Sequence, residues 1–342
     1  MDCRKPAGVY VRSVFRPKGA FMQFRVQSYE SITSTNDVIK RAIEAGESEG
    51  MAVRALRQTA GYGRQGRAWE SPVGGMYQSF LLRPHVPPAQ LPTLSLLVGL
   101  AVRRAVVGLL PQLEGRVQVK WPNDLVVAWD DEVDENVGAA VNGGRSSVHG
   151  LPSVSRQLFV NAATSPVHNS NEAGGGLPLA NGGDAKAGAR PGQPRPFRKL
   201  GGISTEMHAK ALCVGVGVNV ARPEAAAGGA AQPPAGKNVP VYLAELGLGA
   251  GSVEQRIATV ADALCEQLSQ LYPIWCADGF APFREEFDQH AALTGRFVCM
   301  EDLSGNVLAS GLVQGVAPDG RLMLQTPEGK TVYANSGEAH IR

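Results

Sequence analysis

Apolar and polar residues alternate along several short stretches of the chain, with the period of two that is typical of half-buried β-strands. These stretches cover residues 23–29, 51–56, 76–82, 117–121, 199–208 and 211–220. Residues 91–110 are instead apolar for most of their length. We expect them to form a buried helix rather than a membrane span, because Arg103 and Arg104 interrupt the run.

Three further segments have the spacing of amphipathic helices. The first begins at Ser34 or Thr35, either of which is a candidate N-cap, and extends to about residue 45. The second covers residues 253–271 and follows the candidate cap Ser252. The third covers residues 273–290.

The last fifty residues have a different pattern, with short alternating stretches separated by turn residues. We expect strands at residues 294–300, 306–316, 322–326 and 331–334. Strands of this length and number predict a small β-barrel, and the sequence shows no catalytic cluster within it.

Two segments interrupt the patterned regions. Residues 130–197 are first acidic and then rich in Gly, Ala, Asn, Ser and Pro, and residues 222–237 are a second Gly/Ala/Pro-rich loop. The composition of the first segment predicts disorder. Its ends are compatible with a turn, so it can be an insertion at the tip of a hairpin, where the entropy of closure grows only logarithmically with length.

The composition is that of an ordinary globular protein with a sizeable core: 342 residues, 44% apolar and 19% charged. The net charge of +2 is too close to zero to favour nucleic acid as the main partner. The cysteines are odd in number, scattered and without a CxxC pair: Cys3, Cys213, Cys265, Cys276 and Cys299. They indicate reduced thiols in an intracellular compartment, and argue against a zinc site or a disulfide framework.

Residues 1–24 contain five basic residues and one acid. Such a leader is typical of mitochondrial transit peptides, but a loose N-terminal tail is the favoured interpretation. We therefore expect a cytoplasmic protein, with a mitochondrial location as the alternative. The segment is too short for a helix-turn-helix domain, so we expect no sequence-specific DNA binding.

Candidate chemistry begins with the glycine- and arginine-rich segment at residues 58–69, called the Gly-Arg loop below. It follows a predicted strand, has no apolar face to bury and is expected to be mobile. Arg64 and Arg67 offer planar forks that suit a carboxylate or phosphate, and Trp69 offers a face for stacking. A solvated turn is the plainer alternative. A dinucleotide fold is disfavoured because no helix follows at once.

Lys120 is the second candidate, because it ends a predicted strand beside Trp121 and a turn. Such a lysine can be a solvated surface charge, but this setting favours a cation in a cleft that stabilises negative charge on a phosphoryl or acyl oxygen. Alternating valine and glycine at residues 214–220 indicate either a bulged core strand or a floor for a planar ligand, with Asn219 facing a base.

Several segments in this order resemble the biotin–protein ligase family: residues 31–36, 58–69, 120–124, 199–203 and 215–219. The resemblance covers about residues 26–342 outside the two loops. It implies an α+β fold, with a catalytic mixed sheet carrying helices on one face (residues 25–290) and a C-terminal SH3-like barrel (residues 291–342). The sheet would be of the kind shared with class II aminoacyl-tRNA synthetases.

The resemblance also implies an activity. Family members join biotin to ATP with Mg²⁺ to give biotinyl-5′-adenylate and pyrophosphate. They then transfer biotin to one lysine of a biotin carboxyl-carrier domain, as in acetyl-CoA carboxylase. Such a protein would be a monomer or a weak homodimer, with no membrane partner and no metal ligands of its own beyond Mg²⁺ that accompanies ATP.

The resemblance assigns roles residue by residue. It implies that Lys120, Arg64 and Arg67 are catalytic. The biotin contacts would be Ser34, Thr35, Asn36, Gln58, Gly63, Arg64, Gln65 and Lys120. The nucleotide contacts would be Arg67, Trp69, Asn123, Lys199 and Asn219. One departure from the family pattern is that Tyr62 stands where the loop usually has an arginine, so this chain lacks one of the guanidinium groups of the loop.

Two other classes of function are compatible with parts of this pattern. One is a lipoate- or octanoate–protein ligase relative, which would need a long apolar slot. The other is a non-catalytic regulator that binds biotin or a nucleotide, or a nucleic-acid binder that uses Arg64, Arg67 and Trp69. Lys120 argues against the regulator, and the weak net charge argues against nucleic acid.

Overall fold

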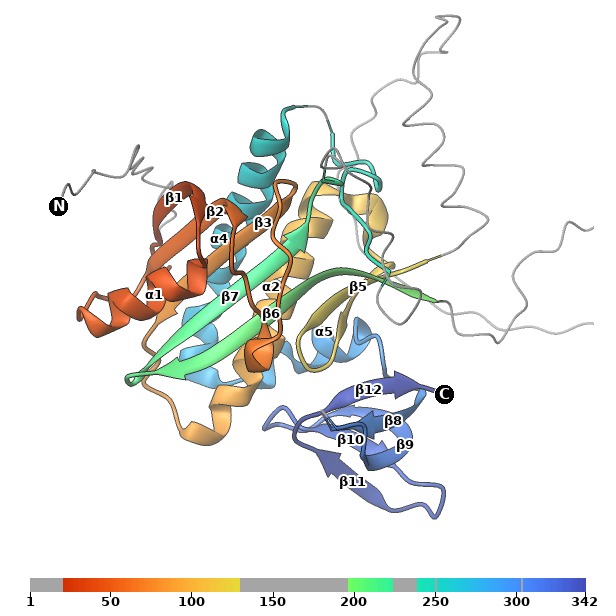
Figure 1. Ribbon diagram of the computed structural model, residues 1–342. Helices are drawn as coiled ribbons and strands as arrows, with labels where there is room; N and C mark the ends of the chain where they lie inside the picture. The colour runs from red at the N-terminus through yellow and green to blue at the C-terminus, as the bar shows by residue number, and fades with distance from the viewer. Residues whose placement is uncertain (1–20, 130–195, 224–238, 250, 303) are drawn as a thin grey trace, which may run out of the picture. The chain divides into compact units, whose positions relative to one another are not determined.

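The stretches with a period of two form strands, and these strands make two sheets (Figure 1). The computed structural model describes residues 21–129, 196–223, 239–249, 251–302 and 304–342. Residues 130–195 of the predicted disordered insertion, nearly all of the second loop and most of the basic N-terminal segment lie outside the described residues. The predicted end of the insertion at residue 197 is wrong, because a strand already begins at Phe197.

Seven described strands make the larger sheet, in the spatial order β1-β2-β3-β7-β6-β5-β4. Their bounds are β1 (Arg25–Ile32), β2 (Met51–Gln58), β3 (Gly75–Leu82), β4 (Val117–Lys120), β5 (Asp124–Ala128), β6 (Phe197–His208) and β7 (Ala211–Asn219). β1 and β2 are parallel, and the other neighbours are antiparallel. The sheet is therefore mixed, as predicted. β4 lies at an edge, where the following Pro122 removes no ladder hydrogen bond.

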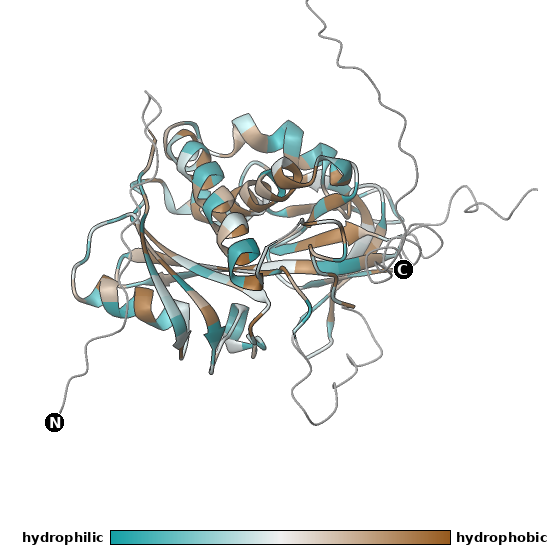
Figure 2. Ribbon diagram, turned by 90° about the horizontal axis from the view of Figure 1, so that it is seen from above, coloured by the Kyte–Doolittle hydropathy of each residue, from teal (hydrophilic) through white to brown (hydrophobic). Residues whose placement is uncertain are grey.

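Helices cover the two faces of this sheet unequally. The long helices α2 (Leu94–Leu109) and α4 (Val253–Asp278) pack against each other and share one face with the main core (Figure 2). The short α1 (Thr35–Glu44) packs on the opposite face, in a separate apolar cluster. Successive strand residues point to opposite faces, so Ala52 belongs to the first cluster and Val53 to the second. The expectation of helices on one face thus holds for α2 and α4, while α1 lies with the side that forms the site.

The apolar segment before β4 is a core helix. Residues Pro88–Leu109 are long and apolar enough to cross a membrane by length and composition, but 67% of the apolar window is buried inside the protein. Arg103 is also buried, and its guanidinium donates to the carbonyls of Val117 and Glu114 at 3.0 and 2.7 Å. A buried arginine with satisfied donors is compatible with a helix packed on a sheet, which supports the predicted buried helix.

The boundary predicted near Pro273 is wrong, because α4 continues to Asp278. Its start is as predicted: Ser252 and Gln255 form a capping box. Proline lacks an N–H, so the carbonyl four residues earlier, that of Ser269, loses its helical donor. The N–H of Met22 donates to this carbonyl at 3.1 Å. A partner from elsewhere in the chain therefore lets the helix tolerate the proline. The predicted third helix is reduced to a 3₁₀ turn (Ala281–Phe283) and α5 (Arg284–Gln289).

The C-terminal residues form a second, antiparallel sheet of five described strands, ordered β11-β10-β9-β8-β12. The strands are β8 (Phe297–Glu301), β9 (Val307–Val316), β10 (Leu322–Gln325), β11 (Thr331–Ala334) and β12 (Glu338–Ile341). The first four were predicted. β12 was not, because Ala339 is its only fully buried apolar residue and gives almost no alternating signal. Trp121 connects the two sheets through a hydrogen bond from Nε1 to the Gly320 carbonyl at 2.9 Å.

The turn between β6 and β7 gives a prediction about stability. Ala209 and Lys210 both have positive φ, 43° and 64°, as a two-residue hairpin turn requires. Neither is glycine, so the turn is strained. We expect Lys210→Gly to raise the free energy of unfolding by about 0.5–1 kcal/mol, measured by urea denaturation. Gly46→Ala, at another position with positive φ and open space around it, should be destabilising. A loss of stability in Lys210→Gly would contradict the strain argument.

Candidate functional site

A cleft of about 710 Å³ lies between the N-terminus of α1, the Gly-Arg loop, the ends of β4 to β7 and the C-terminal sheet. This volume is within the usual range for small-molecule sites. The cleft brings together most of the residues proposed from the sequence: Thr35, Asn36, Gln58, Gly63, Arg64, Gln65, Arg67, Trp69, Lys120, Asn123 and Lys199. Ser34 and Asn219 are not on its wall as formed by the described residues.

One end of the cleft is a buried, neutral hydrogen-bond network. Gln58 Oε1 accepts from the N–H and the hydroxyl of Thr35, at 2.7 and 3.0 Å. Ser79 Oγ donates to Asn36 Oδ1 at 2.6 Å, and Asn36 Nδ2 donates to Ser204 Oγ at 3.4 Å. Thr35, Asn36, Ser79 and Ser204 are almost fully buried. Fixed amides and hydroxyls of this kind suit a compact polar group without charge.

Ser79 and Ser204 were not proposed from the sequence. Each is a small polar residue at a buried position of a strand. In β3, where every residue is buried, a serine beside Phe80, Leu81 and Leu82 is a signal that could have identified Ser79, whereas β6 contains other polar residues and gives no such signal for Ser204. The predicted cap of α1 is not formed by a side chain. Ser34 has the extended backbone of an N-cap, but its side chain makes no capping hydrogen bond, while Thr35 is engaged by Gln58.

The valine–glycine alternation of β7 has a close-approach explanation. A Cβ on Gly215 would lie 2.4 Å from Asn36 Oδ1, and one on Gly217 would lie 3.1 Å from the indole of Trp69. The indole also lies within 3.5 Å of such an atom on Gly202. The predicted floor therefore exists, but Trp69 itself covers it, and a stacked base would have to use the indole. Asn219 instead donates from Nδ2 to the Lys199 carbonyl at 3.1 Å.

Cationic side chains from three segments, the Gly-Arg loop, β4 and β6, reach the same cleft. Arg64 donates from Nη1 to Asn123 Oδ1 at 2.8 Å, and burial lowers the pKa of its guanidinium. Lys199 Nζ lies 2.8 Å from Asp124 Oδ1 and 5.3 Å from the centre of the Trp69 ring. Lys120 lies at the end of β4 on the cleft wall. This distribution favours ligands that carry more than one anionic group.

Arg67 links the Gly-Arg loop to the C-terminal sheet. Its guanidinium hydrogen-bonds Glu338 in β12, and this bond, together with the charges of Arg67, His340 and Lys120, lowers the pKa of the carboxyl. Glu301 and His340 of the same sheet also line the cleft, with a His340 Nε2–Glu301 Oε2 distance of 3.2 Å. Glu301, Glu338 and His340 were not proposed, because no motif in the sequence indicated that the C-terminal sheet reaches the site.

Among the described residues, no group of three or more His, Cys, Asp and Glu side chains could hold a metal ion. The four cysteines in the described ranges are free thiols, and those of Cys213 and Cys265 are buried, which raises the pKa of each to about 12. A thiol that stays protonated is a poor nucleophile or metal ligand.

Two family models match the chain, and both matched ranges contribute residues to this cleft. Residues 28–143 match the Biotin/lipoate A/B protein ligase family, and residues 294–342 match the Biotin protein ligase C terminal domain. The biotin–[acetyl-CoA-carboxylase] ligase of Paracoccus denitrificans is 27% identical over 82% of this chain and 86% of its own length. The bifunctional ligase/repressor BirA of Bacillus spizizenii is 37% identical over 28% of this chain, and that alignment spans only 29% of the BirA protein.

The fold is shared with a solved structure of biotin protein ligase from Aquifex aeolicus in complex with biotin and ATP. The TM-score is 0.57 and the identity is 22%, over 93% of this chain and 98% of the other. The fold class predicted from the sequence is thereby confirmed. The two family matches, the relatives and the shared fold together support a biotin protein ligase.

Proposed function

We propose that the protein is a biotin–protein ligase. It activates biotin with ATP, forms biotinyl-5′-adenylate with release of pyrophosphate, and transfers the biotinyl group to a lysine of a biotin carboxyl-carrier domain. The observation that carries this proposal is the polarity of the cleft, which has a buried neutral network at one end and converging cations beside it. The name of the Paracoccus denitrificans relative and the ligands of the Aquifex aeolicus structure support the same choice.

The two ends of the cleft suit the two ends of the substrate. The ureido ring of biotin has donors and acceptors but no charge, which matches the network around Thr35, Asn36 and Gln58. The biotin carboxylate and the triphosphate are both anions that must meet for the first step. Lys120 and Arg64 are the groups on the wall that can hold them together and offset the charge that develops on the phosphoryl oxygens.

Mg²⁺ would enter with the nucleotide. This ion usually keeps several waters and binds through substrate phosphates with one or two carboxylates, so a cage of protein ligands is not required. Asp124 and Glu301 are carboxylates on the cleft wall that could supply such a contact. The ion would supply charge neutralisation on the phosphates, while the chain's own cations orient the carboxylate.

Transfer of labelled biotin to a purified carrier domain tests the proposal. With ATP and Mg²⁺ we expect biotin-dependent release of pyrophosphate and incorporation of label at one lysine. An excess of lipoate should not compete with biotin. The buried network offers hydrogen-bond partners to a ureido ring, whereas the dithiolane ring of lipoate has no N–H or C=O group to bond with them. Tight biotin binding without pyrophosphate release would favour a regulator instead, and equal competition by lipoate would favour the lipoate ligase relative.

A further inference from the structure

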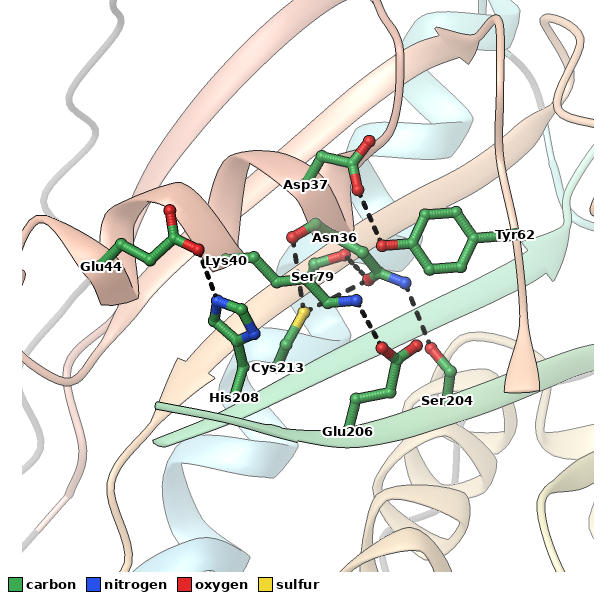
Figure 3. Close-up of polar contacts among 10 residues, drawn as sticks. All are labelled: Asn36, Asp37, Lys40, Glu44, Tyr62, Ser79, Ser204, Glu206, His208 and Cys213. Carbon is green, nitrogen blue, oxygen red and sulfur yellow. Dashed lines mark hydrogen bonds and ion pairs between the residues drawn. The ribbon is translucent and has the colours of Figure 1, made fainter. Parts of the chain in front are cut away.

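Tyr62 of the Gly-Arg loop is attached to α1 on the side of the loop away from the C-terminal sheet. Its hydroxyl donates to Asp37 Oδ1 at 2.8 Å (Figure 3). The Lys40 ammonium lies 5.1 Å from the centre of the Tyr62 ring, and the same ammonium is 2.5 Å from Glu206 Oε2 on β6. The aromatic ring is thus held by an acceptor at its hydroxyl and by a cation near its face.

The two partners of Tyr62, Asp37 and Lys40, are themselves fixed. Asp37 lies in the first turn of α1, where a carboxylate is favourable. Lys40 lies one turn later and is paired with Glu206 across to the sheet. Burial, and the bond to Asp37, raise the pKa of Tyr62 to about 12, so its hydroxyl remains a donor at neutral pH.

The Gly-Arg loop is an ordered two-armed structure rather than an open turn. Gly63 N–H donates to the Arg67 carbonyl at 2.8 Å, and Trp69 N–H donates to the Gly61 carbonyl at 2.9 Å. Its tip, the 3₁₀ turn Arg64–Gly66, is held by the bond from Arg64 to Asn123. With Tyr62 on α1 and Arg67 on Glu338, the loop is attached at three places by contacts within the chain.

These contacts also explain the departure of Tyr62 from the family motif. An arginine at this position would place a second cation beside Lys40, at a cost in repulsion. The tyrosine instead attracts that ammonium and bonds Asp37. We propose that Tyr62 is a positioning residue, and that the Tyr62–Asp37 contact, supported by Lys40, holds the Gly-Arg loop over the cleft before any ligand binds. This inference builds on the proposed function, because the retained ligand would be the acyl adenylate.

Hydrogen exchange of the ligand-free protein tests the contact without requiring activity. We expect Tyr62→Phe, which removes only the hydroxyl, to speed exchange of the Gly63 and Trp69 amides roughly three- to tenfold. Asp37→Ala should have the same effect, and the double variant should add little, because both remove one interaction. Tyr29→Phe is the matched control, since its hydroxyl bonds Gln27 on β1 and is remote from the loop.

Tyr62→Phe and Asp37→Ala also show whether the contact matters for retention of the adenylate. The dissociation rate of biotinyl-adenylate should rise by a similar factor in Tyr62→Phe, while the melting temperature and the rate of adenylate formation change little. A merely structural role would lower the melting temperature instead. Unchanged exchange in both Tyr62→Phe and Asp37→Ala overturns the positioning role. If the variants exchange faster but the wild-type protein forms no adenylate, the positioning role of Tyr62 is supported and the ligase proposal is contradicted.

Discussion

Replacement of Lys120 by alanine is expected to lower the rate of biotinyl-adenylate formation by about 10²–10³-fold, the usual loss when a preorganised electrostatic contact to a transition state is removed. Lys120 is the last residue of β4 and lies on the cleft wall. The preceding Val119 and the following Trp121 are buried, and Trp121 is bonded to Gly320, so the backbone that carries the lysine is fixed. A cation at a fixed position can act on developing charge without reorganisation of the site.

Biotin-dependent exchange of pyrophosphate into ATP measures this step, and calorimetry measures biotin binding separately. We expect the rate of exchange to fall much more than the affinity for biotin. Lys330→Ala, which removes an exposed lysine from the turn between β10 and β11, is the control for a general loss of positive charge. If Lys120→Ala exchanges pyrophosphate at the wild-type rate, Lys120 has no part in the mechanism, regardless of the result for Lys330→Ala.

Gly215→Ala is expected to weaken biotin binding strongly. Gly215 pairs with Ser79 on one side and Ser204 on the other. Its new Cβ would lie 2.4 Å from Asn36 Oδ1 and 2.7 Å from Ser204 Oγ, so these side chains must shift, and we expect the bond from Ser79 to Asn36 to be lost. An unsatisfied buried polar group costs about 1–3 kcal/mol, which corresponds to roughly 5–150-fold in Kd.

Gly202→Ala provides the graded comparison within the same sheet, because its new Cβ would have only ordinary contacts, 3.4 Å or more, with Asp124 and Trp69. We expect a much smaller change in the Kd for biotin, measured for both variants by calorimetry. Equal losses in the two variants would mean that any added methyl group on the floor of the cleft is harmful, and that the network around Asn36 has no special part.

Much of the fold could be predicted because its signals are local. The alternation in β2, β3 and β7 is set by burial of one or both faces, and the capping residue Ser252 is visible in the sequence. The continuation of α4 past Pro273 was not visible, because the hydrogen-bond partner that permits it, Met22, is far away in the chain. β12 was missed because its pairing with β8, rather than its own pattern, makes it a strand.

The site shows the same division. Lys120 and Arg64 were proposed from residue types at a strand end and in a loop, and Gln58 was proposed from the family resemblance; the structure brings all three to one cleft. It could not indicate that Trp69 would cover the glycine floor or that Glu338 would pair with Arg67, since both contacts join segments distant in sequence. Asn219, proposed for its position in the motif, bonds the Lys199 carbonyl because that group is its neighbour in space.

The ends of β5 and β6 lie side by side, since Ala128 pairs with Phe197 and the Trp129 N–H donates to the Pro196 carbonyl at 2.9 Å. The register of the two strands is thus set before the chain leaves the sheet, whatever number of residues follows. The architecture of the site therefore does not depend on the number of residues between the two strands, because the entropy of loop closure costs only about 0.6 kcal/mol more for each doubling of loop length. The junction is consequently a place where evolution, or an engineer who splices in a reporter domain, can change the chain without moving Lys120 or Lys199.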